Sequence, residues 1–234
     1  MKFASAEEMP VLLRGDSGLL QQFIGERSVS RLGFYVAVIF LGAGVFGAAV
    51  GVWRDPLQAI YTAVKFPVIL LLTATGNGLL NGMLAPVLGV RVSFRESLMA
   101  VFMSFAIASA ILGAFAPLMG FLIWNTPALS ANAQASAVAH SFVMVSAVVI
   151  IALAGTVSNV RLLTLLRQFG GPKAAGRTLF AWLVVNLLLG SQLSYILRPF
   201  IGNPAFPVQF LRPDALKSNF FEVLWASLQQ LLSP

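Results

Sequence analysis

Residues 98–124 read LMAVFMSFAIASAILGAFAPLMGFLIW, and this uncharged run decides the fold class. About 20 consecutive apolar residues are enough for a helix to cross the hydrocarbon core of a bilayer. The run exceeds that length, and Trp124 ends it with an aromatic side chain typical of the membrane–water boundary. It therefore predicts a transmembrane helix over Leu98–Trp124, in which Pro117 predicts a kink.

Comparable apolar runs flank this one on both sides. They predict further spans over Gly33–Trp53, Pro67–Val90, Ala133–Val157 and Thr178–Leu197. The composition agrees, because 58% of the 234 residues are hydrophobic and 10% are charged, whereas soluble domains carry about 25% charged residues. The predicted fold is all-α: a polytopic membrane helical bundle of five transmembrane helices.

Three amphipathic segments accompany the predicted spans and define the domain organisation. Residues 1–32 form a cytoplasmic arm with a short interfacial helix capped by Asp16. A second short helix starts at Asp55-Pro56, after span one, and ends at Phe66-Pro67, where the second span begins. Residues 33–197 hold the five spans. Residues 198–234 form an extracytoplasmic tail whose helix starts at a capping box of Asn219 and Glu222.

Basic residues are divided unequally between the two sides of the predicted bundle. With alternating spans, ten Lys and Arg residues fall on the side of the N-terminus and five on the other. Loops rich in Lys and Arg stay in the cytoplasm, so the prediction is an integral membrane protein with a cytoplasmic N-terminus and an extracytoplasmic C-terminus. The ten are Lys2, Arg14, Arg27, Arg31, Arg91, Arg95, Arg161, Arg167, Lys173 and Arg177, and the five are Arg54, Lys65, Arg198, Arg212 and Lys217.

Residue types that usually carry chemistry in membranes are scarce. The chain has no cysteine and one histidine, His140, and its eight acidic residues lie outside the predicted spans. Thiolate catalysis, zinc sites of the usual composition and intramembrane carboxylates are therefore excluded. We expect no catalytic residue, no metal and no cofactor. A serine of another span could still pair with His140 in a membrane enzyme, although an interhelical hydrogen bond explains that histidine more simply.

Polar residues inside the spans form one recognisable stripe. Thr73, Asn77 and Asn81 are spaced four apart, which places them on one helix face. They line a polar cavity in one interpretation and join helices by hydrogen bonds in the other, which the pattern favours. The full candidate set is Thr73, Asn77, Asn81, His140, Asn186 and Gln192.

Two further sets of residues indicate contacts with lipids and with other helices. The basic loops are candidates for lipid-headgroup contacts through Arg91, Arg95, Arg161, Arg167, Lys173 and Arg177, and residues 170–173 predict a loop within them. Small residues at four-residue spacing predict close helix packing at Ala43, Gly47 and Gly51 and at Gly78 and Gly82. The expected partners are membrane lipids and other membrane subunits or further copies of the chain, bound through small-residue and aromatic faces. No nucleic acid is expected.

A series of short motifs adds a resemblance. Lys65-Phe66-Pro67 opens an apolar span and residues 88–95 (LGVRVSFR) close it, followed by Ala114-Phe115-Ala116-Pro117, residues 191–202 (SQLSYILRPFIG) and Asn219-Phe220-Phe221-Glu222. Over roughly residues 55–225 this order resembles the bacterial branch of the Yip-domain family of five-span membrane proteins. The resemblance implies a five-span bundle with a cytoplasmic N-terminus. Eukaryotic relatives act in vesicle traffic and bind small GTPases, but the arm here is short and has no recognisable GTPase-binding motif.

Two functions from different classes follow from these observations. The first is a non-enzymatic integral membrane protein of a bacterial inner (cytoplasmic) membrane that acts as a scaffold, accessory subunit or membrane-organising factor. The second is a transporter or channel for a lipid or small solute, with the polar stripe facing an intramembrane cavity. The scarcity of chemistry-bearing residues favours the first.

Overall fold

The computed structural model describes residues 29–129, 133–202 and 206–232, with positions 10, 14 and 18 in isolation. Within these ranges the elements are α3 (Val29–Gly51), α4 (Pro56–Val87), α5 (Phe94–Trp124), α6 (Ala133–Leu197) and α7 (Phe220–Leu232), and no strand occurs among them. In this part of the chain, α3 to α6 are four helices long and apolar enough to cross a membrane. The all-α prediction is confirmed. The interfacial helix predicted after Asp16 lies outside the described ranges.

The start of α4 follows the prediction, whereas its predicted interruption is wrong. The Asp55 side chain accepts a hydrogen bond from the Leu57 amide at 2.8 Å and caps the helix. The helix then continues through Phe66-Pro67 without ending. It has 32 residues, or about 48 Å at about 1.5 Å per residue, so it exceeds a hydrocarbon core of about 30 Å. The predicted amphipathic helix after span one is therefore the first part of α4.

Close packing by α3 accompanies the passage of α4 through Pro67. A proline inside a helix removes one hydrogen bond and leaves the carbonyl four residues earlier without its helical donor. That carbonyl belongs to Ala63, and a Cβ built on Gly44 of α3 would lie 3.3 Å from its oxygen. Gly44 thus lets α3 lie directly against the site of the missing bond.

Helix α6 is bent sharply at Gly171, whose φ of 72° and ψ of 175° are not helical. A positive φ of this kind favours glycine, and Pro172 suits the first turn of the arm that follows. Both arms, 133–170 and 172–197, are longer than the roughly 20 residues that a span needs. The predicted loop at residues 170–173 is therefore reduced to one non-helical residue.

The ends predicted for spans four and five, Val157 and Thr178, are also wrong as helix boundaries. The helix extends past Val157 because Leu162, Leu165 and Leu166 are buried in the core. Charged residues in this region suggested a loop. Arg167 lies on the exposed side of the helix, opposite these leucines, and Arg161 is half-buried.

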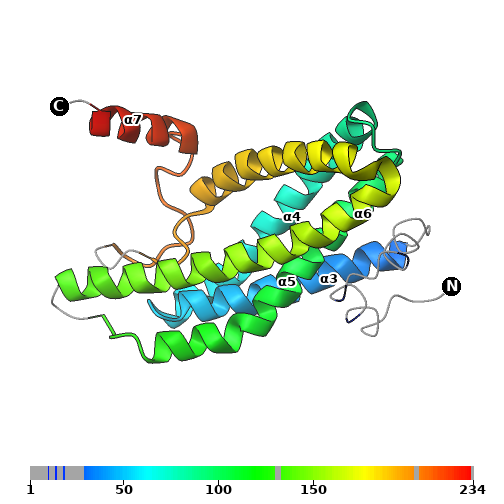
Figure 1. Cartoon of the computed structure of the whole chain (residues 1–234). Coiled ribbons are helices and arrows are strands. Elements are labelled where there is room, and N and C mark those ends of the chain that lie inside the picture. Colours follow the sequence, from blue (N-terminus) through cyan, green and yellow to red (C-terminus); the bar gives the residue numbers. More distant parts are fainter. Residues whose placement is uncertain are drawn as a thin grey trace.

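The helices run lengthwise and give the molecule two distinct ends (Figure 1). The start of α3, the loop between α4 and α5 and the bend of α6 lie at one end, where the Arg91 amide donates to the Phe169 carbonyl at 3.2 Å. The loop between α5 and α6 and the chain after α6 lie at the other. The two arms of α6 diverge from the bend toward that second end, and α7 stands clear of the bundle there.

Small residues bring α3 close to α4 and α5. A Cβ on Gly47 would lie 2.5 Å from the backbone carbonyl oxygen of Thr62, and one on Gly51 would lie 2.7 Å from that of Gln58. Ala43 is fully buried beside them. Gly78 and Gly82 of α4 lie against side chains at the start of α5. All five predicted packing residues thus lie at buried helix contacts.

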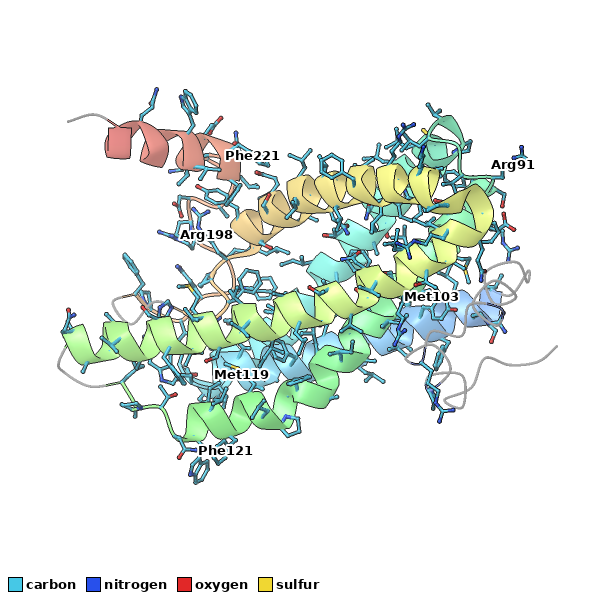
Figure 2. The ribbon with its side chains drawn as sticks, viewed as in Figure 1. Arg91, Met103, Met119, Phe121, Arg198 and Phe221 are labelled. Atoms are coloured by element: carbon cyan, nitrogen blue, oxygen red, sulfur yellow. The ribbon has the colours of Figure 1, made fainter. Side chains whose placement is uncertain are left out.

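Two clusters of buried side chains form the core along the length of α5. Met103 belongs to the cluster nearer the bend of α6, together with Tyr35 and Trp182. Met119 belongs to the cluster nearer the other end, together with Phe46 and Trp53 (Figure 2). Because both clusters combine residues of α3, α5 and α6, the membrane-length helices form one packed unit.

Candidate functional site

Three polar side chains on the first part of α4 form what we call the α4 anchor: Gln58, Thr62 and Lys65. The spacing places them on one helix face, and all three are fully buried. Lys65 Nζ donates to the Pro199 carbonyl at 2.7 Å. Thr62 Oγ1 donates to the Phe200 carbonyl at 2.6 Å. Gln58 Nε2 lies 3.1 Å and 2.7 Å from the same two carbonyl oxygens. The anchor therefore holds the chain just after α6 against α4.

Aromatic rings close the anchor around the Lys65 amine. Nζ lies 4.9 Å from the centre of the Phe210 ring and 5.8 Å from that of Phe200, both within the range of cation–π attraction. Tyr61 packs edge-on against Phe210 at 5.3 Å. The amine is thus held by the Pro199 carbonyl oxygen and by ring faces, and it joins α4 to the chain after α6.

Sequence reasoning did not identify the anchor. In the sequence, Lys65 contributes to the charge count and to the motif Lys65-Phe66-Pro67, and neither predicts a buried contact. Gln58, Thr62 and Lys65 recur at intervals of four and three, a polar helical face beside an apolar span, and this signal was available in the sequence. Their acceptors are the backbone carbonyls of Pro199 and Phe200, far along the chain. Every residue has such a carbonyl, so residue type does not identify the acceptors.

The predicted polar stripe divides into three separate environments. Asn81 donates to Asn77, and Asn77 Nδ2 donates to Asn186 Oδ1 at 2.5 Å, which joins α4 to the second arm of α6. Thr73, one turn away from Asn77 on α4, is also buried. The side chains of Asn77, Asn81 and Asn186 face one another instead of an open channel. A small cavity of about 140 Å³ borders Asn186.

His140 and Gln192 lie apart from the asparagines. The His140 ring lies 5.9 Å from the Trp53 ring, between α3 and the first arm of α6. Gln192 Oε1 accepts a hydrogen bond from the Phe220 amide at 3.0 Å, at the start of α7. The stripe is therefore not one continuous surface, and Gln192 holds the C-terminal helix.

The asparagine contact predicts energetic coupling between α4 and α6. Asn77→Leu and Asn186→Leu are each expected to destabilise the protein, and the double variant should lose less than the sum, with a coupling of about 0.6 to 1.7 kcal/mol. Unfolding in mild detergent measures it. The control pairs Asn77→Leu with Asn159→Leu, because Asn159 bonds to Gly155 of its own helix. Equal coupling in both cycles would contradict the assignment of the bond as a link between helices.

A crevice of about 540 Å³ opens between the two arms of α6. Its walls come from the first arm, from α4 at Phe66 and Leu70, and from the chain after α6 at Phe200, and the second arm contributes Ser194. His140, Ser194 and Arg198 supply its polar side chains. The crevice lies where the arms have diverged, on the side of the molecule where Arg198 is labelled in Figure 2. It is large enough for a ligand, since pockets for small molecules measure about 300 to 1,000 Å³.

The basic candidates for headgroup contacts surround the end of the molecule at the bend of α6, which we call the basic end. Arg91 marks it in Figure 2. Arg91, Arg167, Lys173 and Arg177 are exposed, whereas Arg95 and Arg161 are half-buried. Exposed guanidinium and amine groups at the end of a membrane bundle suit contact with phosphate headgroups.

No group of three His, Asp or Glu side chains close enough to hold a metal occurs among the described residues. In the comparisons with known proteins, no family model, curated protein or solved structure matches the chain.

Proposed function

We propose that the chain is a non-enzymatic, five-span protein of a bacterial inner membrane that acts as a scaffold or accessory subunit and presents α7 to another membrane protein. The observation that carries this proposal is the α4 anchor. It uses a buried amine and two buried polar side chains to fix the chain that leads from α6 to α7. Buried polar groups employed in this way build a platform rather than a reaction centre.

Five crossings and a cytoplasmic N-terminus are supported by the shape of α6 and by the placement of charge. Each arm of α6 is long enough to span the bilayer alone, so α3, α4, α5 and the two arms make five crossings. The exposed residue Arg91 lies in the loop between α4 and α5, and the exposed residues Arg167 and Arg177 lie on the two arms of α6, at the basic end. An odd number of crossings places α7 on the extracytoplasmic side.

Among the residues whose side chains the structure describes, the contacts of α7 with the rest of the molecule lie at its beginning. Asn219 and Glu222 form the predicted capping box, with the Glu222 amide donating to Asn219 Oδ1 at 2.9 Å. Tyr195 and Ser218 share a hydrogen bond of 2.5 Å just before it. Beyond that point Leu224 and Trp225 are 45% and 64% exposed. The helix therefore has a fixed start and an uncovered apolar side.

The charge of α7 favours a protein partner over a lipid surface. Helices that lie on headgroups usually carry Lys and Arg on their polar face. The sequence of α7, FFEVLWASLQQLL, contains Glu222 and no basic residue. Anionic headgroups would repel Glu222, whereas an apolar groove of a second membrane subunit would cover Leu224 and Trp225. We therefore assign the uncovered side of α7 to such a subunit.

Trp225→Ala combined with Leu224→Ala tests this assignment. We expect the affinity for the partner subunit to fall about tenfold or more, since truncating a buried aromatic anchor costs about 2 kcal/mol. The full chain is purified from native membranes in mild detergent, and the mass and stoichiometry of the complex are measured by native mass spectrometry. Trp124→Ala is the matched control, because Trp124 is equally aromatic, 89% exposed and outside α7.

Loss of a stoichiometric second subunit in the α7 variant alone would support the proposal. An inert monomer for the unaltered chain in mild detergent would contradict it. So would a complex that survives both substitutions, or an α7 that binds protein-free vesicles equally well with and without anionic lipid.

The resemblance to the Yip-domain family agrees with this proposal. Two motifs on which it rests, Lys65-Phe66-Pro67 and the segment 198–202, lie in contact through the bond from Lys65 to the Pro199 carbonyl and the Phe66–Phe200 ring pair.

A further inference from the structure

We propose that the crevice between the arms of α6 binds one acyl chain of an anionic phospholipid, with the headgroup phosphate at Arg198. The α7 partner plays no part in this site, which goes beyond the scaffold role and depends only on the membrane setting. Three properties of the crevice indicate a phospholipid: its apolar walls, its depth, and the positive charge and unpaired Nε of Arg198 at its end.

The walls select a hydrocarbon ligand. Phe66, Leu70, Met144 and Ile151 are among the residues that line the crevice, and polar side chains contribute little of its surface. The outward side of the same arm is apolar as well, with Val145 and Val149 more than half exposed. Apolar surface on a membrane-length helix faces lipid tails, so the ligand available to this crevice is an acyl chain.

The depth of the crevice matches one leaflet. Along the first arm of α6 its lining runs from His140 to Ile151, which is about 16 Å at about 1.5 Å per residue. The hydrocarbon core of a bilayer is about 30 Å thick, so one leaflet contributes about half of that. Beyond Ile151 the smaller cavity is bordered by Ser158, Asn159 and Asn186, and these polar groups mark where an apolar site ends.

Arg198 supplies the headgroup end. Its guanidinium has five N–H donors. Nη1 donates to the Tyr195 carbonyl at 3.0 Å, and Nη2 lies 3.5 Å from a carboxylate oxygen of Asp214. Nε is buried and has no acceptor among the described residues. Arg212 also pairs with Asp214, at 3.4 Å, so two guanidinium groups share one carboxylate and a positive charge remains. Guanidinium groups bind phosphate oxygens in a forked geometry.

The experiment uses the full chain in phosphatidylcholine vesicles that contain a small fraction of phosphatidylglycerol carrying a photoreactive group in one acyl chain. Illumination followed by peptide mass spectrometry locates the adducts. We expect them on Met144 and Ile151 and on the Phe66–Leu70 stretch, saturating as the fraction of labelled lipid rises. Val145 and Val149, which face outward on the same arm, should be labelled weakly and without saturation.

Two crevice variants and two charge variants complete the design. Ala147→Phe fills the crevice from a buried position, and Val148→Trp narrows it from an exposed position where folding is not at stake. Ala152→Phe is the control on the exposed side of the arm. Arg198→Gln should lower crevice labelling about tenfold or more, as expected for a lost charged hydrogen bond. Lys217→Gln, at an exposed position outside the crevice lining, is its control.

Saturable labelling that Val148→Trp and Arg198→Gln abolish, and that the two controls leave within twofold, would support the site. Equal labelling of Met144 and Val145 would overturn it, because lipids would then surround the arm without a specific site. Adducts on Val145 and Val149 with none on Met144 would also overturn it, since the crevice would then hold no acyl chain.

Discussion

Lys65→Glu is expected to release the chain after α6 from α4 and to lower the free energy of unfolding in mild detergent by about 3 to 5 kcal/mol. The amine is fully buried and donates to the Pro199 carbonyl at 2.7 Å. A carboxylate at position 65 would face the Pro199 carbonyl oxygen, which would have lost its donor. It would also lie close to the aromatic side chains of Phe200 and Phe210. An unpaired buried charge of this kind ranks among the most destabilising single changes.

The same variant should change a local property that simple destabilisation leaves unaltered. Trypsin cleavage after Lys217 is expected to accelerate while the helices remain folded, because the anchor holds this part of the chain. Lys65→Met should have a smaller effect, since it keeps the volume and removes both the bond and the cost of burying a charge. Lys217→Glu, at an exposed position, should change stability by less than about 0.5 kcal/mol. Unchanged cleavage in Lys65→Glu would rule out the anchor.

Gly42→Val is the second large effect, and we expect it to cost about 3 kcal/mol or more and to separate α3 from α5. A Cβ on Gly42 would lie 2.6 Å from the Ser109 carbonyl carbon, which is backbone and cannot rotate away. Gly113 approaches from the facing helix, where its own Cβ would lie 3.0 Å from the Gly42 Cα. The two helices therefore meet through adjacent glycines, and any side chain at Gly42 pushes the backbones apart.

Thermal unfolding in detergent measures this prediction, and two glycines of the same helices provide controls. Gly33 of α3 and Gly120 of α5 have no atom within 4 Å of a built Cβ. Gly33→Val and Gly120→Val carry the same intrinsic penalty of valine in a helix, less than about 1 kcal/mol relative to alanine. If all three variants lose equal stability, the close approach of α3 and α5 at Gly42 is wrong.

Gly42 also shows where sequence reasoning about packing stops. The spacing of Ala43, Gly47 and Gly51 predicted a small-residue face, and in the structure Gly47 and Gly51 lie against α4. Gly42 belongs to the neighbouring face of α3 and meets Gly113 of α5. The spacing of residues within α3 does not predict this pairing. Four-residue repeats indicate which side of a helix is small, but the facing helix is chosen by the whole bundle.

The crevice and the anchor illustrate the same division for the candidate sites. His140 was predicted as a polar group inside the bundle, but its place on the wall of a cavity depends on how far the arms of α6 diverge. Lys65 and Pro199 are 134 positions apart in sequence and 2.7 Å apart in space. Contacts between residues so far apart in sequence depend on how every intervening helix packs. The amino-acid sequence by itself therefore does not predict them directly.

The sequence alone determined the all-α class, the membrane-length helices, the cap at Asp55 and the capping box at Asn219 and Glu222. Each of these depends on local properties: the length of an apolar run, or a side chain beside its own backbone amides. Only the tertiary structure decided that α4 continues through Pro67, that α6 extends to Gly171 and that the α4 anchor holds the chain after α6. In these cases packing against distant residues outweighs a local signal of proline or charge, because burial of whole side chains involves more free energy than one backbone hydrogen bond.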